Sequence, residues 1–296
     1  MNPPTLRHLP ALGLGLLLLS GCGLAPNRLA GSPPSATPPA ALPAAPPARA
    51  TPTPPLEHQA LARVLKRVVD RDGLVDYRRL QRDPGDLETY LAELGAVPAA
   101  SFAAWDETEQ IAFLINAYNA LTLASIIRQE PIRPSIRDIW GVWNLTRHRV
   151  AGEAVTLDHI EHGILRRRYD EPRIHAALVC AAISCPPLRQ EPFRGASLEH
   201  QLEDQSRRWL RSRHGLQIDR AAGTVGISAI FQWFGDDWKR RYATDHGFGR
   251  HRDRRAVLNF ISGYVSAADR DLLRRGDYRL SVLEYDWSLN SQPDGS

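Results

Sequence analysis

The sequence lacks several features that would each place it in a definite class. It has no basic motif interleaved with aromatic residues, which argues against nucleic-acid binding, and it has no internal repeat. The apolar run at residues 11–19 is too short to cross a bilayer as a mature helix. Hydrophobic residues make up 43% and charged residues 24% of the 296 residues, which is typical of a globular chain and excludes a fully disordered or multi-span membrane protein.

The N-terminus has the pattern of an exported protein. The first ten residues carry Arg7 and no acidic residue, and the short apolar run follows. The next residues, Leu-Ser-Gly-Cys at 19–22, resemble the bacterial lipobox, in which the cysteine thiol receives a diacylglyceryl group. We therefore predict a signal peptide at residues 1–21 and lipidation of Cys22, with an ordinary signal peptide cut elsewhere as the alternative. Gly23 follows in place of aspartate, which favours the outer over the inner membrane of a Gram-negative cell.

The segment after Cys22 is rich in proline and alanine. Residues 24–57 include 11 Pro and 9 Ala and almost no large apolar side chain, so burial cannot offset the entropy lost on ordering. We predict that residues 22–57 are a disordered tether, which holds the folded domain, residues 58–296, away from the membrane in the periplasm.

Residues 58–296 have the pattern of a helix-rich α+β domain with a small sheet. Their apolar residues recur mostly at helical spacing, with a few short apolar runs typical of buried strands. The expected helices are 61–69, 87–94, 107–128, 156–168, 197–213, 253–264 and 267–274, the expected strands are 74–77, 173–180, 225–227 and 278–283, and a short hairpin falls within 145–155.

The expected helix at residues 107–128 is apolar nearly all round, which predicts that it is central and buried. Asp106 and Glu109 have the spacing of a capping box at its start. Asn116 and Asn119 share one face of this helix. Buried amides need hydrogen-bond partners, so these two either clamp loop carbonyls or line a pocket and bind substrate.

Histidines and carboxylates gather in the middle of the chain. Asp158 and His162 lie four residues apart on the helix expected after Thr156, where a carboxylate can orient the imidazole of a general base or form a surface ion pair. Glu161 is a candidate acid beside them. His175 lies in the apolar run expected to be a strand, where it is either a satisfied core residue or a base.

Cys180 and Cys185 remain as a pair once Cys22 is lipidated. In an oxidising compartment they predict a disulfide that closes a short loop. A free nucleophilic thiol and a zinc site shared with His175 or His162 are the alternatives, although the spacing is not that of a zinc finger. No cofactor is predicted.

Residues 228–238 combine a helix-capping serine with a cluster of aromatic residues. Core packing is the default interpretation. An aspartate between these tryptophans is also able to line a polar cleft, and the rings to stack on a sugar.

Four blocks between residues 105 and 240 together resemble the domain of unknown function family 547. They are Phe113–Leu123 with Asp138–Trp140, Thr156–Arg166, Arg173–His175 with Cys180 and Cys185–Leu188, and Ser228–Trp238. The resemblance implies membership of a family found in bacterial envelope proteins and in plants, and it implies no settled chemistry.

The sequence leaves two interpretations of function open. The first is an envelope lipoprotein that binds or scaffolds an envelope protein, a glycan or a small molecule, with membrane lipid reached through Cys22. The second is a periplasmic hydrolase or transferase, in which Glu161, His162, His175, Cys180 or Cys185 perform catalysis. Asn116, Asn119 and Arg173 would then bind substrate. Whether the chain is an enzyme is not decided by its sequence.

Overall fold

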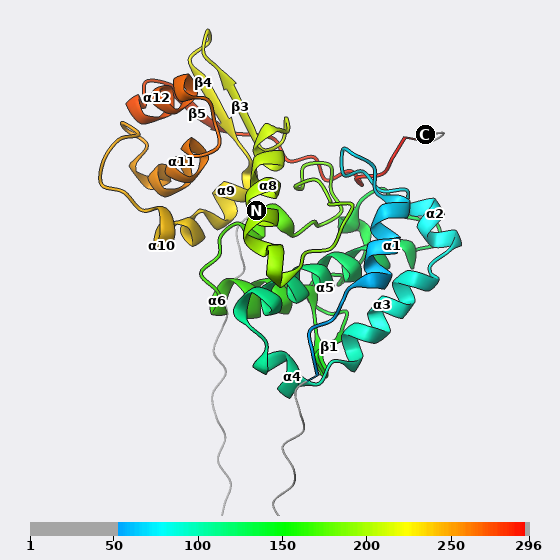
Figure 1. The fold of residues 1–296 in the computed structure, drawn as a ribbon. Coiled ribbons are helices and arrows are strands. Elements are labelled where there is room, and N and C mark those ends of the chain that lie inside the picture. The colour runs from blue at the N-terminus through cyan, green and yellow to red at the C-terminus, as the bar shows by residue number, and fades with distance from the viewer. Residues whose placement is uncertain (1–52, 294–296) are drawn as a thin grey trace, which may run out of the picture. The chain divides into compact units, whose positions relative to one another are not determined.

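The computed structural model describes residues 53–293 (Figure 1). The predicted signal peptide, Cys22 and most of the predicted tether lie outside these residues. The first described residues already contact the domain, because the backbone N–H of Thr53 donates to Ser101 and its carbonyl accepts from the indole of Trp105.

Five helices make up the N-terminal part of the domain. They are α1 Gln59–Val68, α2 Tyr77–Arg82, α3 Gly85–Ala96, α4 Ala99–Ala104 and α5 Glu107–Ile127. α1 and α3 pack against each other, and α2 and α3 contact α5 (Figure 1).

Helix α5 is the centre of this core. Every residue from Ile111 to Ile126 is buried, as expected for a helix with apolar residues on all sides. By length and composition alone α5 could span a membrane, but 89% of its most apolar window is buried inside the domain. Each fully buried Leu, Ile or Phe contributes roughly 1.5–3 kcal/mol to folding, so α5 supplies much of the hydrophobic stabilisation.

Short elements connect α5 to the next long helix. They are η1 Ile136–Asp138, the hairpin strands β1 His148–Val150 and β2 Glu153–Val155, the π-helix η2 His159–Leu165, α6 Arg166–Arg168, α7 Ile174–Ala177 and η3 Gly195–Ser197. The long helix is α8 Leu198–Arg211.

A second hydrophobic core lies under a three-stranded sheet. Strand β4 is central, antiparallel to β3 and parallel to β5. The elements are β3 Leu216–Asp219, β4 Thr224–Ile227, α9 Ala229–Phe234, η4 Gly235–Trp238, α10 Lys239–Tyr242, η5 Arg252–Arg254, α11 Arg255–Ser262, α12 Ala267–Arg275 and β5 Arg279–Val282. Trp209, Trp238 and Phe260 are fully buried in this core.

After β5 the chain runs back to the N-terminal helices, as the red segment of Figure 1 shows. There Asn290 accepts from the hydroxyl of Tyr77 and its backbone carbonyl accepts from Val75 N–H. Ala182 and Leu289 form an antiparallel bridge on the way. The last segment therefore connects the two cores.

The predicted α+β class is confirmed, and all seven expected helices, the hairpin and the strands at 225–227 and 278–283 occur. The expected strand at 173–180 is wrong, because residues 174–177 form the helical turn α7. A short apolar run does not distinguish a buried strand from a buried helical turn, and here the Glu171 carboxylate accepts the Arg173 N–H and favours the turn.

Two smaller expectations are also corrected. Asp106 precedes α5 but its side chain makes no capping hydrogen bond. The expected strand at 74–77 is reduced to bridges at Val75, and Tyr77 already begins α2. Helices α2 and α4 and strand β3 were not predicted, since each is too short to show a clear period.

Candidate functional site

A cavity of about 230 Å³ lies where the two cores meet α9 and the C-terminal segment. Residues from α5, η2, α7, α9 and three loops contribute to its wall. The lining residues are Tyr118, Trp143, Asp158, Glu161, His162, His175, Leu178, Cys180, Cys185, Ile230, Trp233, Phe234, Tyr285 and Trp287.

All five predicted catalytic residues meet at this cavity: Glu161, His162, His175, Cys180 and Cys185. They belong to segments that no local pattern links. A second cavity, of about 650 Å³ beside α2 and the C-terminal segment, holds none of them. The smaller cavity is therefore the candidate site, since its lining joins titratable groups with apolar walls.

One side of the cavity is supplied by η2. Thr156 Oγ1 accepts from the N–H of His159 near its start. His162 Nε2 lies 4.0 Å from an oxygen of Asp158, and His162 Nδ1 lies 3.9 Å from an oxygen of Glu161. The π-helical turn thus places two carboxylates and an imidazole together, and π-helical turns are frequent at functional sites.

Glu161 also approaches Tyr118 on α5. Burial, followed by the nearby Glu161 charge, raises the pKa of the Tyr118 hydroxyl well above its ordinary value. Tyr118 is therefore a neutral hydrogen-bond donor at the cavity, and its partner is a carboxylate.

His175 extends from α7 into the cavity wall and is 3% exposed. Its ring stacks on Phe234 at 4.6 Å between centroids and on Trp238 at 5.2 Å. Its Nε2 lies 2.7 Å from Oδ2 of Asp237. No residue among 53–293 hydrogen-bonds Nδ1, so this nitrogen is the one left for a bound molecule.

Asp237 orients His175. Arg166 also donates to both of its carboxylate oxygens, over 2.6 and 3.0 Å. Burial alone would raise the pKa of the Asp237 carboxyl, but hydrogen bonds from His175 and Arg166 outweigh it and hold that pKa far below its usual range. Asp237 is therefore ionised at neutral pH, and its charge is paired.

Aromatic rings make up most of the remaining wall. Trp233 stacks on Trp287 at 5.9 Å, and Tyr285 packs against both rings at 4.8 and 4.6 Å. Trp143 meets Trp287 edge-on at 6.2 Å. Trp233 is nevertheless 46% exposed, which is unusual for so large an apolar side chain and places it at the mouth of the cavity.

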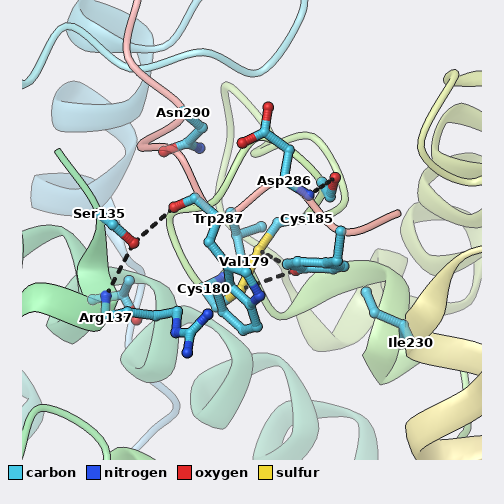
Figure 2. The surroundings of a disulfide bond; sticks show 12 residues. Ser135, Arg137, Val179, Cys180, Cys185, Ile230, Asp286, Trp287 and Asn290 are labelled. Atoms are coloured by element: carbon cyan, nitrogen blue, oxygen red, sulfur yellow. Dashed lines mark hydrogen bonds between the residues drawn. A yellow bond between two sulfur atoms is a disulfide. The ribbon is translucent and has the colours of Figure 1, made fainter. Parts of the chain in front are cut away.

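Cys180 and Cys185 form a disulfide, with 6.2 Å between their Cα atoms. The Tyr285 hydroxyl lies 3.3 Å from one sulfur and 3.2 Å from the other. Figure 2 shows Trp287 among the residues that surround the disulfide. The backbone carbonyl of Trp287 accepts from the Ser135 hydroxyl at 2.8 Å. In this bonded state neither sulfur is a thiolate, so neither is a nucleophile.

The zinc alternative gains no support. No group of three or more His, Cys, Asp and Glu side chains within residues 53–293 is arranged to hold a metal ion. Both sulfurs that would have served as ligands are joined to each other.

The predicted substrate-binding residues lie elsewhere. Asn116 donates to the carbonyl of Phe193 and accepts from its N–H, and Asn119 does the same between Ala177 and Val179. Both amides clamp backbone, as the alternative interpretation holds, and neither lines the cavity.

Arg173 is also absent from the cavity wall. It is buried and forms ion pairs with Glu171 and Glu199, each with contacts of 2.6 Å. Its place between α7 and α8 indicates a structural role in positioning His175 two residues later.

Sequence reasoning missed several residues of the site. It noted only an aspartate between tryptophans at 233–238, and Asp237 is the residue of that pattern that meets His175. It gave no sign of Tyr118, Trp143, Tyr285 or Trp287. Exposure alternates along residues 283–289, and this alternation directs Tyr285 and Trp287 inward. The pattern was visible as Tyr-x-Trp, but nothing local showed which surface it covers.

Residues 102–210 match the family described as protein of unknown function, DUF547. This match supports the domain family that the sequence resembles, and its residues include α5, η2, α7 and the disulfide. No curated protein and no solved structure matches the chain. The aromatic residues Trp233, Tyr285 and Trp287 lie outside the matched range.

Proposed function

We propose that this chain is a lipoprotein of the cell envelope whose folded domain binds a small molecule in the aromatic cavity. The observation that carries the proposal is the convergence of Glu161, His162 and His175 on one cavity with mostly aromatic walls. Ligand sites are typically apolar hollows with a few polar groups that fix orientation. The lipobox supports anchoring through Cys22, and Gly23 favours the outer membrane with the domain in the periplasm. We propose no nucleic-acid partner.

Thermal denaturation of the full chain with defined probes tests this binding function. The probes are choline, methyl glucoside and cresol, each at millimolar concentration. A molecule that binds only the folded state raises Tm by mass action. We expect at least one probe to raise Tm of the wild type and to have little effect on Trp233→Ala, which removes part of the mouth.

Trp140→Ala is the matched control, because Trp140 is 86% exposed and does not line the cavity. This variant should respond as the wild type does. If no probe raises Tm, or if Trp233→Ala responds as strongly as the wild type, the cavity is not the binding site.

Acid–base catalysis is the second candidate, and the His175–Asp237 pair favours it. Asp237 fixes the ring through Nε2, which leaves Nδ1 as the basic nitrogen. In ester hydrolysis, water would give a proton to Nδ1 as its oxygen bonds to the acyl carbon. The leaving alkoxide would take that proton as its C–O bond breaks. Glu161 would be the second polar group of the site.

Hydrolysis of chromogenic esters by wild type and His175→Gln tests this candidate. Catalysis predicts a rate at least roughly a hundredfold above that of the variant. Equal rates from two folded proteins would remove the hydrolase candidate and leave the binding function in place.

A further inference from the structure

The charges that line the aromatic cavity are predominantly acidic. Asp158 and Glu161 contribute carboxylates, and no lysine or arginine belongs to the lining. His162 lies between these two carboxylates, and even in its protonated form it would balance only one of them. Arg166 lies outside the lining. Its guanidinium is paired with Asp237, and its Nη1 lies 3.2 Å from Nδ1 of His162, so the two acidic groups of the lining keep no ion pair with it.

The aromatic rings add further attraction for positive charge. The face of an aromatic ring carries negative electrostatic potential, and tryptophan attracts cations most strongly. Two rings of the cavity wall already contact a cation on the protein. The guanidinium of Arg137 lies 5.3 Å from the ring centre of Trp287, and the guanidinium of Arg166 lies 4.6 Å from the ring centre of Phe234. Trp143, Trp233 and Tyr285 have no such cation among the described residues.

The lining is poorly suited to a sugar. A sugar presents hydroxyls all round, and each buried hydroxyl needs a hydrogen-bond partner. The lining offers a sugar few partners beyond two carboxylates and two imidazoles, because no Asn, Gln, Lys or Arg lines the cavity and the Tyr285 hydroxyl is already directed at the disulfide. The volume of about 230 Å³ corresponds to roughly eight waters at about 30 Å³ each, enough for a compact head group.

We propose that the aromatic cavity recognises a substituted ammonium group, held by Glu161 and the tryptophan faces. This inference rests on the proposed binding function and names the chemical class of its ligand. The carboxylate supplies the opposite charge. An alkylated cation is weakly hydrated, so contact with the ring faces can replace the water it loses. A metal ion would lose a much stronger hydration shell, and a neutral ring would have no charge for the ring faces to attract.

Isothermal titration of the full chain with choline and with its neutral carbon isostere tests the proposal. The isostere has the same shape but a quaternary carbon in place of the nitrogen, so any difference in affinity reports the charge. The detergent should be a polyoxyethylene ether, because it carries neither a choline group nor a sugar. We expect choline to bind at least roughly tenfold more tightly than the isostere.

Variants locate the effect. Glu161→Gln keeps the size of the side chain and should weaken choline roughly tenfold while it leaves the isostere unchanged. Trp233→Ala should weaken choline by a similar factor. The matched controls, Glu153→Gln on the exposed part of β2 and Trp140→Ala, should bind choline as the wild type does.

The outcomes separate the two proposals. Equal affinity for choline and the isostere would overturn the cation inference and keep the binding function. Choline binding that survives both Glu161→Gln and Trp233→Ala would place the cation outside the cavity and overturn the inference. Binding of methyl glucoside without choline would indicate a sugar site instead. If neither choline nor any other probe binds, both proposals fail.

Discussion

At the scale of single residues, the site depends on how one imidazole is held. His175 is stacked between Phe234 and Trp238, and its Nε2 contacts Asp237. Arg166 donates to both oxygens of the same carboxylate. The Asp237 contact leaves Nδ1 as the ring nitrogen with no hydrogen-bond partner among residues 53–293, and Asp237 stays charged at any pH near neutrality. The residue that orients the site is thus not one of those that touch the cavity.

Asp237→Asn should lower the free energy of unfolding by about 2 kcal/mol at pH 7, because charge-assisted hydrogen bonds from His175 and Arg166 are lost. The folded-state pKa of Asp237 lies below the unfolded value of about 3.9, so its stabilisation is complete above that pH and is lost as the pH falls through the folded value. Urea denaturation at several pH values should show the wild type and variant converging below about pH 4.

Asp236→Asn is the control for this measurement. Its side chain is 84% exposed and, within the described part of the chain, pairs with Lys239 alone, so we expect a change within about 0.5 kcal/mol. A gap between wild type and Asp237→Asn that stays constant down to pH 2 would contradict the role given to the Asp237 charge.

At the scale of elements, α5 positions the site without forming much of its surface. Asn119 on α5 clamps the chain between Ala177 and Val179, directly after the turn that carries His175. Asn116 performs the same function for Phe193. The amides that looked like ligand-binding groups therefore act on backbone, which they connect to the most buried helix of the domain.

Asn119→Ala should destabilise the domain by about 2–4 kcal/mol, because a buried carbonyl and a buried N–H lose their partners. It should also speed hydrogen exchange at Val179 beyond the change seen across α1. Gln129→Ala is a suitable control, since this half-buried amide lies just beyond the end of α5 and, among residues 53–293, its side chain makes one hydrogen bond, of 3.3 Å to the Ser125 carbonyl. Local exchange at Val179 that is no faster than elsewhere would mean that the clamp is not specific.

The elements that the sequence predicts and those that it misses differ in a physical way. The long helices were predictable because burial imposes a period on ten or more residues, as in α3, α5 and α8. The turn α7 was mistaken for a strand because four buried residues show no period. Glu161, His162 and His175 could be singled out as candidates because their chemistry is rare inside apolar segments, and all three line the cavity. Tyr285 and Trp287 were not, because their role depends on contacts with residues more than a hundred positions away, such as Trp143.

At the scale of the whole molecule, two predictions remain joined: a membrane anchor at Cys22 and a ligand site in the domain. The C-terminal segment contributes Tyr285 and Trp287 to the cavity and then binds the N-terminal helices through Asn290. The cavity is thus completed only when the chain has closed on itself. The tether would let this closed domain reach away from the bilayer.

Cys22→Ala tests the anchor. Without the thiol no diacylglyceryl group can be attached at residue 22, so the hydrophobic attachment is lost. Stable anchoring needs more than one acyl chain. We expect the variant to move from the membrane fraction to the soluble fraction of the cell envelope, while Cys180 and Cys185 remain paired. Retention of the variant in the membrane fraction would count against lipidation at this residue.

The most direct test of the central claim uses the seven tryptophans as position markers. Fluorine-labelled tryptophan gives one resonance for each, and three of them, Trp143, Trp233 and Trp287, line the cavity. On titration with choline we predict saturable shifts of these three resonances, with Trp105, Trp140 and Trp209 unchanged. Shifts that appear at Trp140 but not at Trp233 and Trp287, or no shift at any of the seven, would contradict the claim that this cavity binds the ligand.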